Sequence, residues 1–360
     1  MKKVLVSMLF ASLSIVIMAQ SGIPTTPLVK IREMQLMAEV DEVLGNDVKS
    51  LVIESKFGKV DVLPCPDTLQ STRIVGRLEA MDKEDGYAFN VDNNNPNSMS
   101  LSFSIPEQTN SAFSCEFVVY LHESTQLTVI STTGSVNIKK VNGANVKVQT
   151  EKGKVNIDRV KGVFDITTLA GAITVSHAVD TVKLKSNSGA VNIADCEGYI
   201  YANAGDGALS AKNIKGELIT NTIGGKQAID QIEGNLDLNS KGGLIRMTYI
   251  NANIIKVSTV KGDISFGNSI KGALNISTAS GTVGSAQAIV LTGSSSFESE
   301  TGRIKLKFAN KKEELTFHIT ADTKESAILA KGTSKKKRLQ MGNGNIIVTS
   351  HSKRGDQIFS

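Results

Sequence analysis

Carboxylate side chains recur at matching positions along this chain, and a pair of carboxylates is what a glycoside hydrolase would use. From Gly134 onward, glycines recur about every eighteen residues, a spacing that indicates a stack of repeating coils. Counted from the glycine that leads each coil, Asp165 and Asp237 share position +12, four coils apart. At about 4.8 Å per coil they would lie roughly 19 Å apart. Hydrolysis requires a pair within about 5–10 Å, so these two do not predict a catalytic site.

The remaining acidic residues lead to the same expectation. Asp158 and Asp230 share position +5, again four coils apart, and Glu197 and Glu233 share position +8 with Lys215 on the coil between them. Opposite charges stacked in this way indicate a solvated ladder of ion pairs. No histidine accompanies a Ser or Cys nucleophile, and the chain has neither a phosphate-binding loop nor a calcium-binding repeat. We therefore predict no catalytic residues, no metal site and no cofactor.

Position +3 is the candidate binding position, because it lies between two inward residues and must face outward. On five consecutive coils it carries a polar side chain that could align with a repetitive ligand such as a cell-wall or surface glycan, or with an envelope protein. The alternative is a solubilising face whose side chains bond to one another up the stack. These residues are Asn137, Asn156, Thr174, Asn192 and Ser210.

The elements that must position this row follow from two glycine series. The second series runs about nine residues behind the first, with Asp180 and Ala252 in two of its places, so each coil has two corners. A corner glycine is needed for positive φ or for close approach of backbone. The first series is Gly134, Gly153, Gly171, Gly189, Gly207, Gly225, Gly243, Gly262, Gly281 and Gly302, and the second is Gly143, Gly162, Gly198, Gly216, Gly234 and Gly272.

Between these corners, apolar residues fall at +2, +4, +7, +11 and +13 and alternate with polar ones, as in half-buried strands. The coil led by Gly153 carries Val155, Ile157, Val160, Phe164 and Ile166 at these positions. The pattern predicts two short strands joined by two turns. The expected fold is therefore all-β: a single-stranded parallel β-helix or β-solenoid with two-sided coils of about 18 residues, capped by an N-terminal β region. The pattern leaves its handedness open.

The N-terminus has the pattern of a secretory signal peptide. Lys2 and Lys3 precede an uncharged apolar run over residues 4–18, which is shorter than the roughly 20 residues of a membrane span. Export is therefore expected to the periplasm, the outer-membrane surface or the medium, with no transmembrane span after cleavage. The Asn-rich residues 92–97 are predicted to form a loop. The expected divisions are a signal peptide (1–20), a segment of undecided structure (21–48), an N-terminal β cap (49–132), solenoid repeats (133–310), and C-terminal coils with their cap (311–360).

Composition excludes some partners. The formal net charge is +5 before signal cleavage, too small for a nucleic-acid-binding surface on a chain of this length. There is no tryptophan and aromatics make up 5% of the chain, which argues against stacking platforms for bases or sugars. Cys65 and Cys115 could pair in an oxidising compartment, or, with Cys196, could simply be buried small hydrophobic residues.

Two short motifs have structural interpretations as well as functional ones. The tripeptide Arg354–Asp356 matches an integrin-binding sequence, but Gly355 also fits the corner pattern. The basic run Lys335–Arg338 could contact anionic lipid or polysaccharide, or could be a solvated loop of the cap.

The recurring Gly-x-Val-x-Ile of residues 134–138, 153–157 and 189–193, with the lead-in strands at 118–121 and 127–134, resembles a known group. It is similar to the adhesin-like β-strand-repeat family of exported bacterial proteins of unknown function, close to the auto-transporter adhesin head domain. The resemblance covers roughly residues 48–350. It implies an envelope location and a non-catalytic adhesive or structural role. The alternatives are a carbohydrate-active β-helix enzyme, as a polysaccharide lyase or hydrolase, and a self-assembling envelope scaffold.

Overall fold

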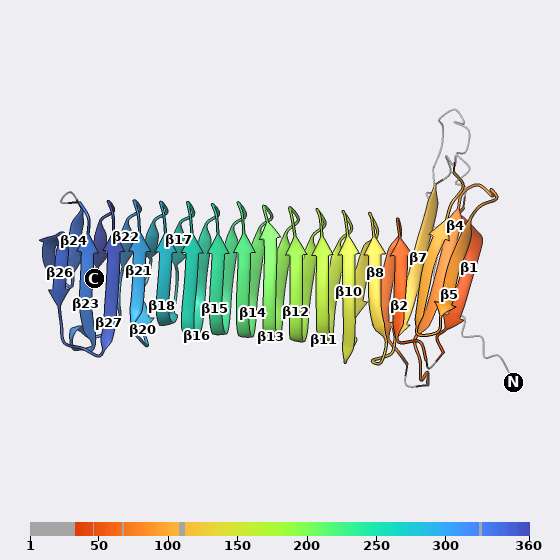
Figure 1. The fold of residues 1–360 in the computed structure, drawn as a ribbon, viewed down its shortest axis with the longest axis horizontal. Coiled ribbons are helices and arrows are strands. Elements are labelled where there is room, and N and C mark those ends of the chain that lie inside the picture. Colours follow the sequence, from red (N-terminus) through yellow and green to blue (C-terminus); the bar gives the residue numbers. More distant parts are fainter. Residues whose placement is uncertain (1–32, 46, 67, 108–111, 324–325) are drawn as a thin grey trace, which may run out of the picture. The chain divides into compact units, whose positions relative to one another are not determined.

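The computed structural model describes residues 33–360 apart from 46, 67, 108–111, 324 and 325. The predicted signal peptide lies outside these residues. All described elements belong to the compact unit Met34–Ser360, which consists of strands and one 3-10 helix, η1 (Lys312–Glu314). Successive coils of this unit stack in parallel along one axis, from yellow to blue in Figure 1. This arrangement confirms the predicted β-solenoid.

Six long strands form the middle of the stack, and each follows most of one coil. Neighbouring strands pair in parallel and in register, so that Val155 is level with Ile173 and Ile173 with Val191. Each strand continues through the second corner, so a coil is one bent strand where the sequence predicted two strands separated by a turn. The six are β11 (Val155–Thr168), β12 (Ile173–Ser186), β13 (Val191–Gly205), β14 (Leu209–Thr222), β15 (Gln227–Ser240) and β16 (Ile245–Thr259).

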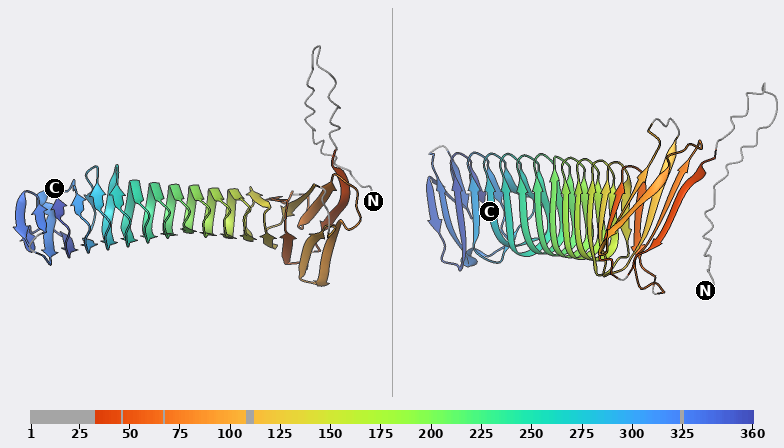
Figure 2. Two further views of the ribbon diagram at one scale, coloured as in Figure 1. Left: turned by 90° about the horizontal axis from the view of Figure 1, so that it is seen from above. Right: turned by 45° about the vertical axis from the view of Figure 1, so that its right-hand side comes forward.

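The two halves of each long strand belong to two facing walls (Figure 2). The first wall holds positions +2 to +5, and the second wall holds +10 to +15. Side chains at the five predicted apolar positions point between the walls; in the coil led by Gly153, all five are no more than 2% exposed. Full burial of such a side chain contributes about 1.5–3 kcal/mol, so these positions supply the main stabilisation of the stack.

A sixth inward position was not predicted, because it is polar. A buried Ser or Thr stands three residues before most leading glycines, and its hydroxyl accepts a hydrogen bond from the glycine N–H. Thr168 Oγ1 is 2.8 Å from Gly171 N, and Ser186 Oγ is 2.8 Å from Gly189 N. The hydroxyl satisfies a corner N–H that would otherwise be buried without a partner. The same contact is made by Thr150, Ser240, Thr259, Thr278 and Ser352.

Close packing of backbone explains the leading glycines. A Cβ added to Gly171 would lie 1.9 Å from the carbonyl oxygen of Gly153 on the preceding coil. The leading glycines do not have positive φ; the second series does, for example Gly162 at 134° and Gly198 at 119°. The first corner therefore excludes a side chain for lack of space. The second corner excludes it for lack of space and because its φ is positive.

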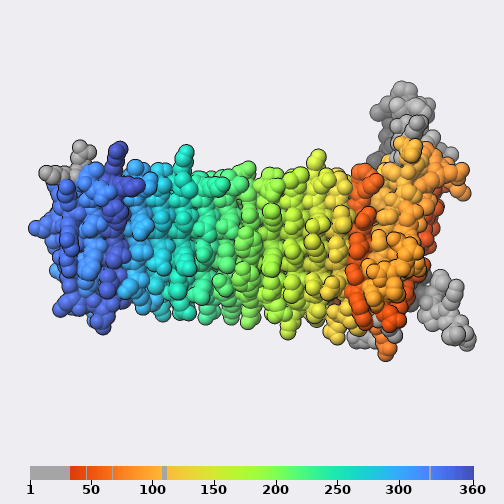
Figure 3. Space-filling model, in the orientation of Figure 1, coloured from red at the N-terminus to blue at the C-terminus, as the bar shows by residue number. Residues whose placement is uncertain are grey.

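The N-terminal region contains ten shorter strands. β2 and β3 already form a coil: β2 pairs in parallel with β8, and β3 with β9. On their other side they pair with β6 and β7, so this coil lies between later parts of the chain (Figure 3). The strands are β1 (Gln35–Val43), β2 (Ser50–Ser55), β3 (Lys59–Pro64), β4 (Arg73–Ala80), β5 (Ala88–Asn95), β6 (Ser98–Ser104), β7 (Phe113–Leu121), β8 (Gln126–Ser131), β9 (Ser135–Lys139) and β10 (Ala144–Thr150).

The loop predicted over residues 92–97 is wrong for most of its length. β5 continues to Asn95, and only Pro96 and Asn97 form the turn into β6. The reason is pairing: β5 and β6 form an antiparallel hairpin in which Asp92 is level with Ser100, so cross-strand hydrogen bonds outweigh the low strand propensity of asparagine.

The C-terminal coils are also out of sequence order. β27 lies between β21 and β23, and β28 lies between β22 and β24. In Figure 3 they form the dark blue band with lighter blue on both sides. The strands are β17 (Ile264–Phe266), β18 (Ile270–Thr278), β19 (Val283–Ser285), β20 (Val290–Leu291), β21 (Ser295–Ser299), β22 (Ile304–Leu306), β23 (Leu315–Ala321), β24 (Ala327–Ala330), β25 (Thr333–Lys336), β26 (Arg338–Met341), β27 (Ile346–Ser352) and β28 (Gln357–Phe359).

Antiparallel strands close both ends of the stack. β26 runs antiparallel to β23 and β25 antiparallel to β24, while β4 is antiparallel to β7 and β5 to β6. A parallel stack presents open strand edges at its ends, and strands that reverse direction cover them.

Candidate functional site

The predicted row at position +3 is brought together as expected. Its five residues stand one per coil on β9, β11, β12, β13 and β14, in consecutive register on the outer face of the first wall. None of them is buried. We call this set the ladder; it comprises Asn137, Asn156, Thr174, Asn192 and Ser210.

The first part of the ladder is held by hydrogen bonds along the stack. Asn156 Nδ2 donates to Asn137 Oδ1 over 2.9 Å, and Asn137 Nδ2 donates to Asp61 Oδ1 over 2.8 Å. Asp61 is level with Asn137 on β3, so the row begins one coil earlier than the sequence predicted. The signal for it was present, because residues 58–62 have the same corner-plus-strand pattern as the later coils.

A lysine anchors this end of the row. Lys59 Nζ lies 2.5 Å from Asp61 Oδ2 and 3.0 Å from Glu116 Oε1. The hydrogen bond that Lys59 donates to Asp61, with a further one donated to Glu116, raises the pKa of Lys59 above its ordinary value. Asp61 is thus engaged on both sides and is fixed in the wall.

The second part of the ladder is different. Thr174, Asn192 and Ser210 have no side-chain hydrogen-bond partner in the part of the chain that the structure describes, and Thr174 and Asn192 are exposed. The next two coils place Ala228 and Arg246 at the same level, so the uncharged polar row ends at Ser210. These three side chains keep their donors and acceptors available to a ligand.

A second polar row follows the bend of each coil, at position +6. Its residues adopt the left-handed backbone conformation although none is glycine, with φ between 52° and 57° on seven successive coils. This conformation points each side chain out from the corner. The sequence analysis missed the row, because residue types vary from coil to coil: Lys140, Arg159, His177, Asp195, Asn213, Gln231 and Tyr249.

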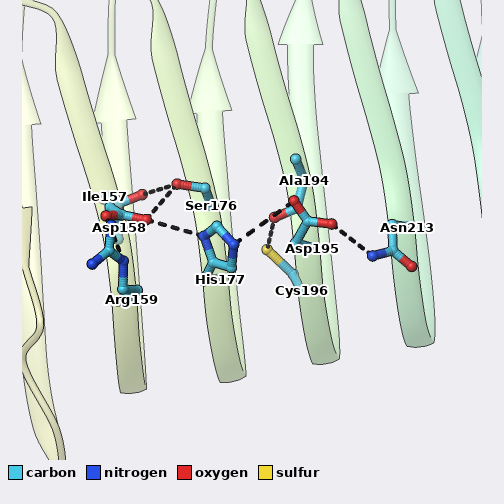
Figure 4. A network of polar contacts seen from close by, with 9 residues as sticks. All are labelled: Ile157, Asp158, Arg159, Ser176, His177, Ala194, Asp195, Cys196 and Asn213. Atoms are coloured by element: carbon cyan, nitrogen blue, oxygen red, sulfur yellow. Dashed lines mark hydrogen bonds and ion pairs between the residues drawn. The ribbon is translucent and has the colours of Figure 1, made fainter.

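The part of this row from Arg159 to Asn213 belongs to a network of polar contacts (Figure 4). Asp158, at +5, accepts a hydrogen bond from Ser176 Oγ over 2.9 Å and lies 3.1 Å from His177 Nδ1. His177 Nε2 is 3.9 Å from Asp195 Oδ2, and Asn213 Nδ2 donates to Asp195 Oδ1 over 2.6 Å. The contacts therefore link four successive coils along the outside of the stack.

The network lowers the pKa of Asp158 below its ordinary value of 3.8, chiefly through the Ser176 hydrogen bond, with help from His177 and Arg159. A depressed pKa favours the charged form in the folded state, so its contribution is present above pH 3.8 and is lost as the pH falls below that value. We predict that Asp158→Asn lowers the stability by at most about 1 kcal/mol near neutral pH, since the group is partly solvated.

The thermal unfolding midpoints of Asp158→Asn and the wild type should converge as the pH falls below 3.8. Asp165→Asn is the matched control: Asp165 is exposed on the second wall and has no ion-pair partner within the described ranges. A difference for Asp158→Asn that stays constant with pH would contradict this assignment.

The carboxylates considered for catalysis stay in their separate rows. Glu197, Lys215 and Glu233 are level with one another on β13, β14 and β15, but among the described residues no ion pair joins them, so the predicted stack of ion pairs is not formed. Asp165 and Asp237 keep the same position on the second wall of β11 and β15. Among residues that the structure describes, no group of three His, Cys, Asp or Glu side chains could hold a metal ion.

The cysteines occupy core or near-core positions. Cys115 and Cys196 are buried, and burial raises the pKa of Cys115 to about 12 and that of Cys196 to about 11. Cys65 Sγ lies 3.3 Å from the carbonyl oxygen of Leu69. No disulfide links these three residues. Thiols with such high pKa values are poor nucleophiles at neutral pH.

The two short motifs lie in the C-terminal coils. Gly355 is a corner glycine, since an added Cβ would meet Gly302 O at 1.9 Å, and Asp356 accepts a hydrogen bond from Ala327 N over 3.0 Å. Its carboxylate also pairs with Arg303. The tripeptide is thus part of the coil. The basic run Lys335–Arg338 lies exposed where β25 meets β26.

In the described part of the chain, no helix is long and apolar enough to cross a lipid bilayer.

A protein-family model matches part of the chain, from the N-terminal β region into the repeats. Residues 75–220, from β4 to β14, match the family model for Toastrack DUF4097. No curated protein matches the chain. Among solved structures, a candidate cell adhesion protein from Clostridium sporogenes ATCC 15579 is 10% identical, covers 90% of this chain and 99% of its own, and has a TM-score of 0.24. The repeat pattern, the β-solenoid and the Toastrack match at residues 75–220 fit an adhesin-like β-repeat family of unknown function.

Proposed function

We propose that this protein is an exported, non-catalytic scaffold of the cell envelope, which binds a repetitive polymer along the ladder in the manner of an adhesin. The observation that carries the proposal is the second part of the ladder. Thr174, Asn192 and Ser210 face outward one per coil, in register, and lack side-chain partners within the described residues. Polar groups repeated at strand spacing, about 4.8 Å, suit a polymer with regularly spaced hydroxyl or amide groups.

A cell-wall or surface glycan is the ligand class that fits this row best. The row carries hydroxyls and amides without formal charge, so it offers both donors and acceptors to a neutral polar chain. An envelope protein remains the second candidate partner. The carbohydrate-active enzyme is the less favoured alternative, because the acidic pairs considered for catalysis, which share a position in the coil, lie two or four coils apart. Turnover of any polysaccharide by the purified protein would contradict the proposal.

Two lysines introduced into the ladder should weaken binding. Asn156→Lys with Asn192→Lys places a bulky charge on two coils of the row, and we expect binding to whole cells or to purified envelope glycans to fall at least tenfold, or by about 1.4 kcal/mol. A pull-down with cells, followed by titration with the glycan that is retained, measures the effect. The matched control is Val163→Lys with Asn221→Lys, which adds the same charge to the second wall. Unchanged binding by the ladder variant would remove the proposal.

A further inference from the structure

A groove of about 300 Å³ lies at the second corner of three consecutive coils, on β14, β15 and β16. Its sides are formed by side chains at positions +6 and +8, one of each from every coil. They are Asn213, Lys215, Gln231, Glu233, Tyr249 and Asn251. The groove is separate from the ladder, whose side chains stand at +3 on the first wall.

The floor of the groove is apolar and rigid. Ile214 and Ile232, at position +7, line it while remaining almost completely buried in the core. Because these side chains belong to the packed interior, the groove is preformed and does not depend on a loop. Its two polar sides run parallel to the axis of the stack.

Most polar groups along the groove have no partner within the protein. Lys215, Gln231, Glu233 and Asn251 make no side-chain hydrogen bond or ion pair with any residue that the structure describes. This distinguishes them from the network of Figure 4, which uses the same corner positions but satisfies its own members up to Asn213. The corner row therefore has a self-bonded part and an open part, and only the open part encloses a groove.

Tyr249 adds an aromatic side chain to the groove. Gln231 and Tyr249 have φ of 55° and 53°, the left-handed conformation that all seven residues of the corner row share, and it points their side chains outward. Tyr249 is 51% exposed, with its hydroxyl held by Asn268 Nδ2 at 3.2 Å, so its ring presents a fixed apolar face.

From these observations we propose that the groove is a binding site for a neutral, linear glycan running along the stack, with about one sugar per coil. Amide side chains and a lysine–glutamate pair offer both donors and acceptors, as vicinal hydroxyls require. The two formal charges of the lining cancel, so a polyanion gains nothing there. An extended peptide would bind through a free strand edge, but the strands here are paired on both sides.

The test is titration calorimetry of the full-length protein with neutral linear hexasaccharides of glucose, mannose, xylose and N-acetylglucosamine, and with an oligogalacturonate of equal length. We expect at least one neutral hexasaccharide to bind, and Gln231→Ala with Tyr249→Ala to weaken that binding about tenfold or more. Lys140→Ala is the matched control, because Lys140 has the same position and conformation (φ 57°) but lies outside the groove. Asn251→Ala, which leaves the corner backbone untouched, provides a second variant if the first is unfolded.

Three results would overturn the proposal. They are no binding by any neutral hexasaccharide, equal binding of oligogalacturonate, or unchanged affinity in the folded groove variants. Failure of the groove proposal can be distinguished from failure of the ladder proposal, since Asn156→Lys with Asn192→Lys leaves the groove intact. Glycan binding that is lost in the ladder variant but kept in the groove variants would support the ladder and refute the groove.

Discussion

Replacing Phe359 with alanine should lower the free energy of unfolding of the C-terminal coils by about 3–5 kcal/mol, the usual cost of truncating a fully buried phenylalanine. Phe359 is 0% exposed, and its ring centroid lies 5.8 to 6.1 Å from those of Phe297, Phe308 and Phe317. These rings come from β21, from the segment after β22, and from β23. The substitution therefore removes the side chain that joins the coils on both sides of β27 and β28.

Hydrogen exchange of the amides in β21 to β24 measures this effect locally, which matters because long repeat arrays need not unfold in one step. Phe57→Ala is the control, since Phe57 is 39% exposed near the other end of the stack. Native-like protection of β21 to β24 in Phe359→Ala would show that the Phe359 side chain on β28 does not hold these strands together.

Gly171→Ala should be comparably damaging, at about 3 kcal/mol or more, the upper end of the range for overpacking. The added methyl group would lie 1.9 Å from the carbonyl oxygen of Gly153, and 2.8 Å from the Thr168 hydroxyl that bonds the Gly171 N–H. The obstructing atom is backbone, so relief requires two coils to separate locally. Chemical denaturation followed by circular dichroism measures the loss.

Gly284→Ala is the matched control for this prediction. Nothing lies within 4 Å of a Cβ placed on Gly284, and its φ is not positive. Alanine there should be neutral or stabilising by about 0.4–1 kcal/mol, because it restricts the unfolded chain. If both substitutions had the same effect, close packing of carbonyl and glycine could not be the reason for the glycine series.

The repeat made most of the coil predictable. Val155, Ile157 and Phe164 are buried as their spacing indicated, because period-two alternation is clear in the middle coils. The Ser/Thr position was missed although it recurs in the sequence, as with Thr168 before Gly171. A polar residue at a fixed distance from a corner glycine is a signal for a buried hydroxyl, and hydrophobicity alone does not detect it.

The candidate sites were predictable to different degrees. The ladder follows from counting residues, so Asn156 and Asn192 stand where the sequence put them. The groove beside Gln231 depends on which side chains find partners inside the protein, and it is visible only in three dimensions. The placement of β27 between β21 and β23 was likewise not predictable, because local periodicity is the same whichever neighbour a coil pairs with.

That placement has a consequence for how the chain reaches its native state. Repeat arrays ordinarily fold by nucleating at one place and adding neighbouring units in turn. Here the strands β21 and β23 are synthesised before the segment that must separate them. Premature docking of β23 on β21 would leave residues 346–360 with no place to enter. The last step of folding is therefore a long-range insertion, and we expect it to be slower than growth of the middle coils.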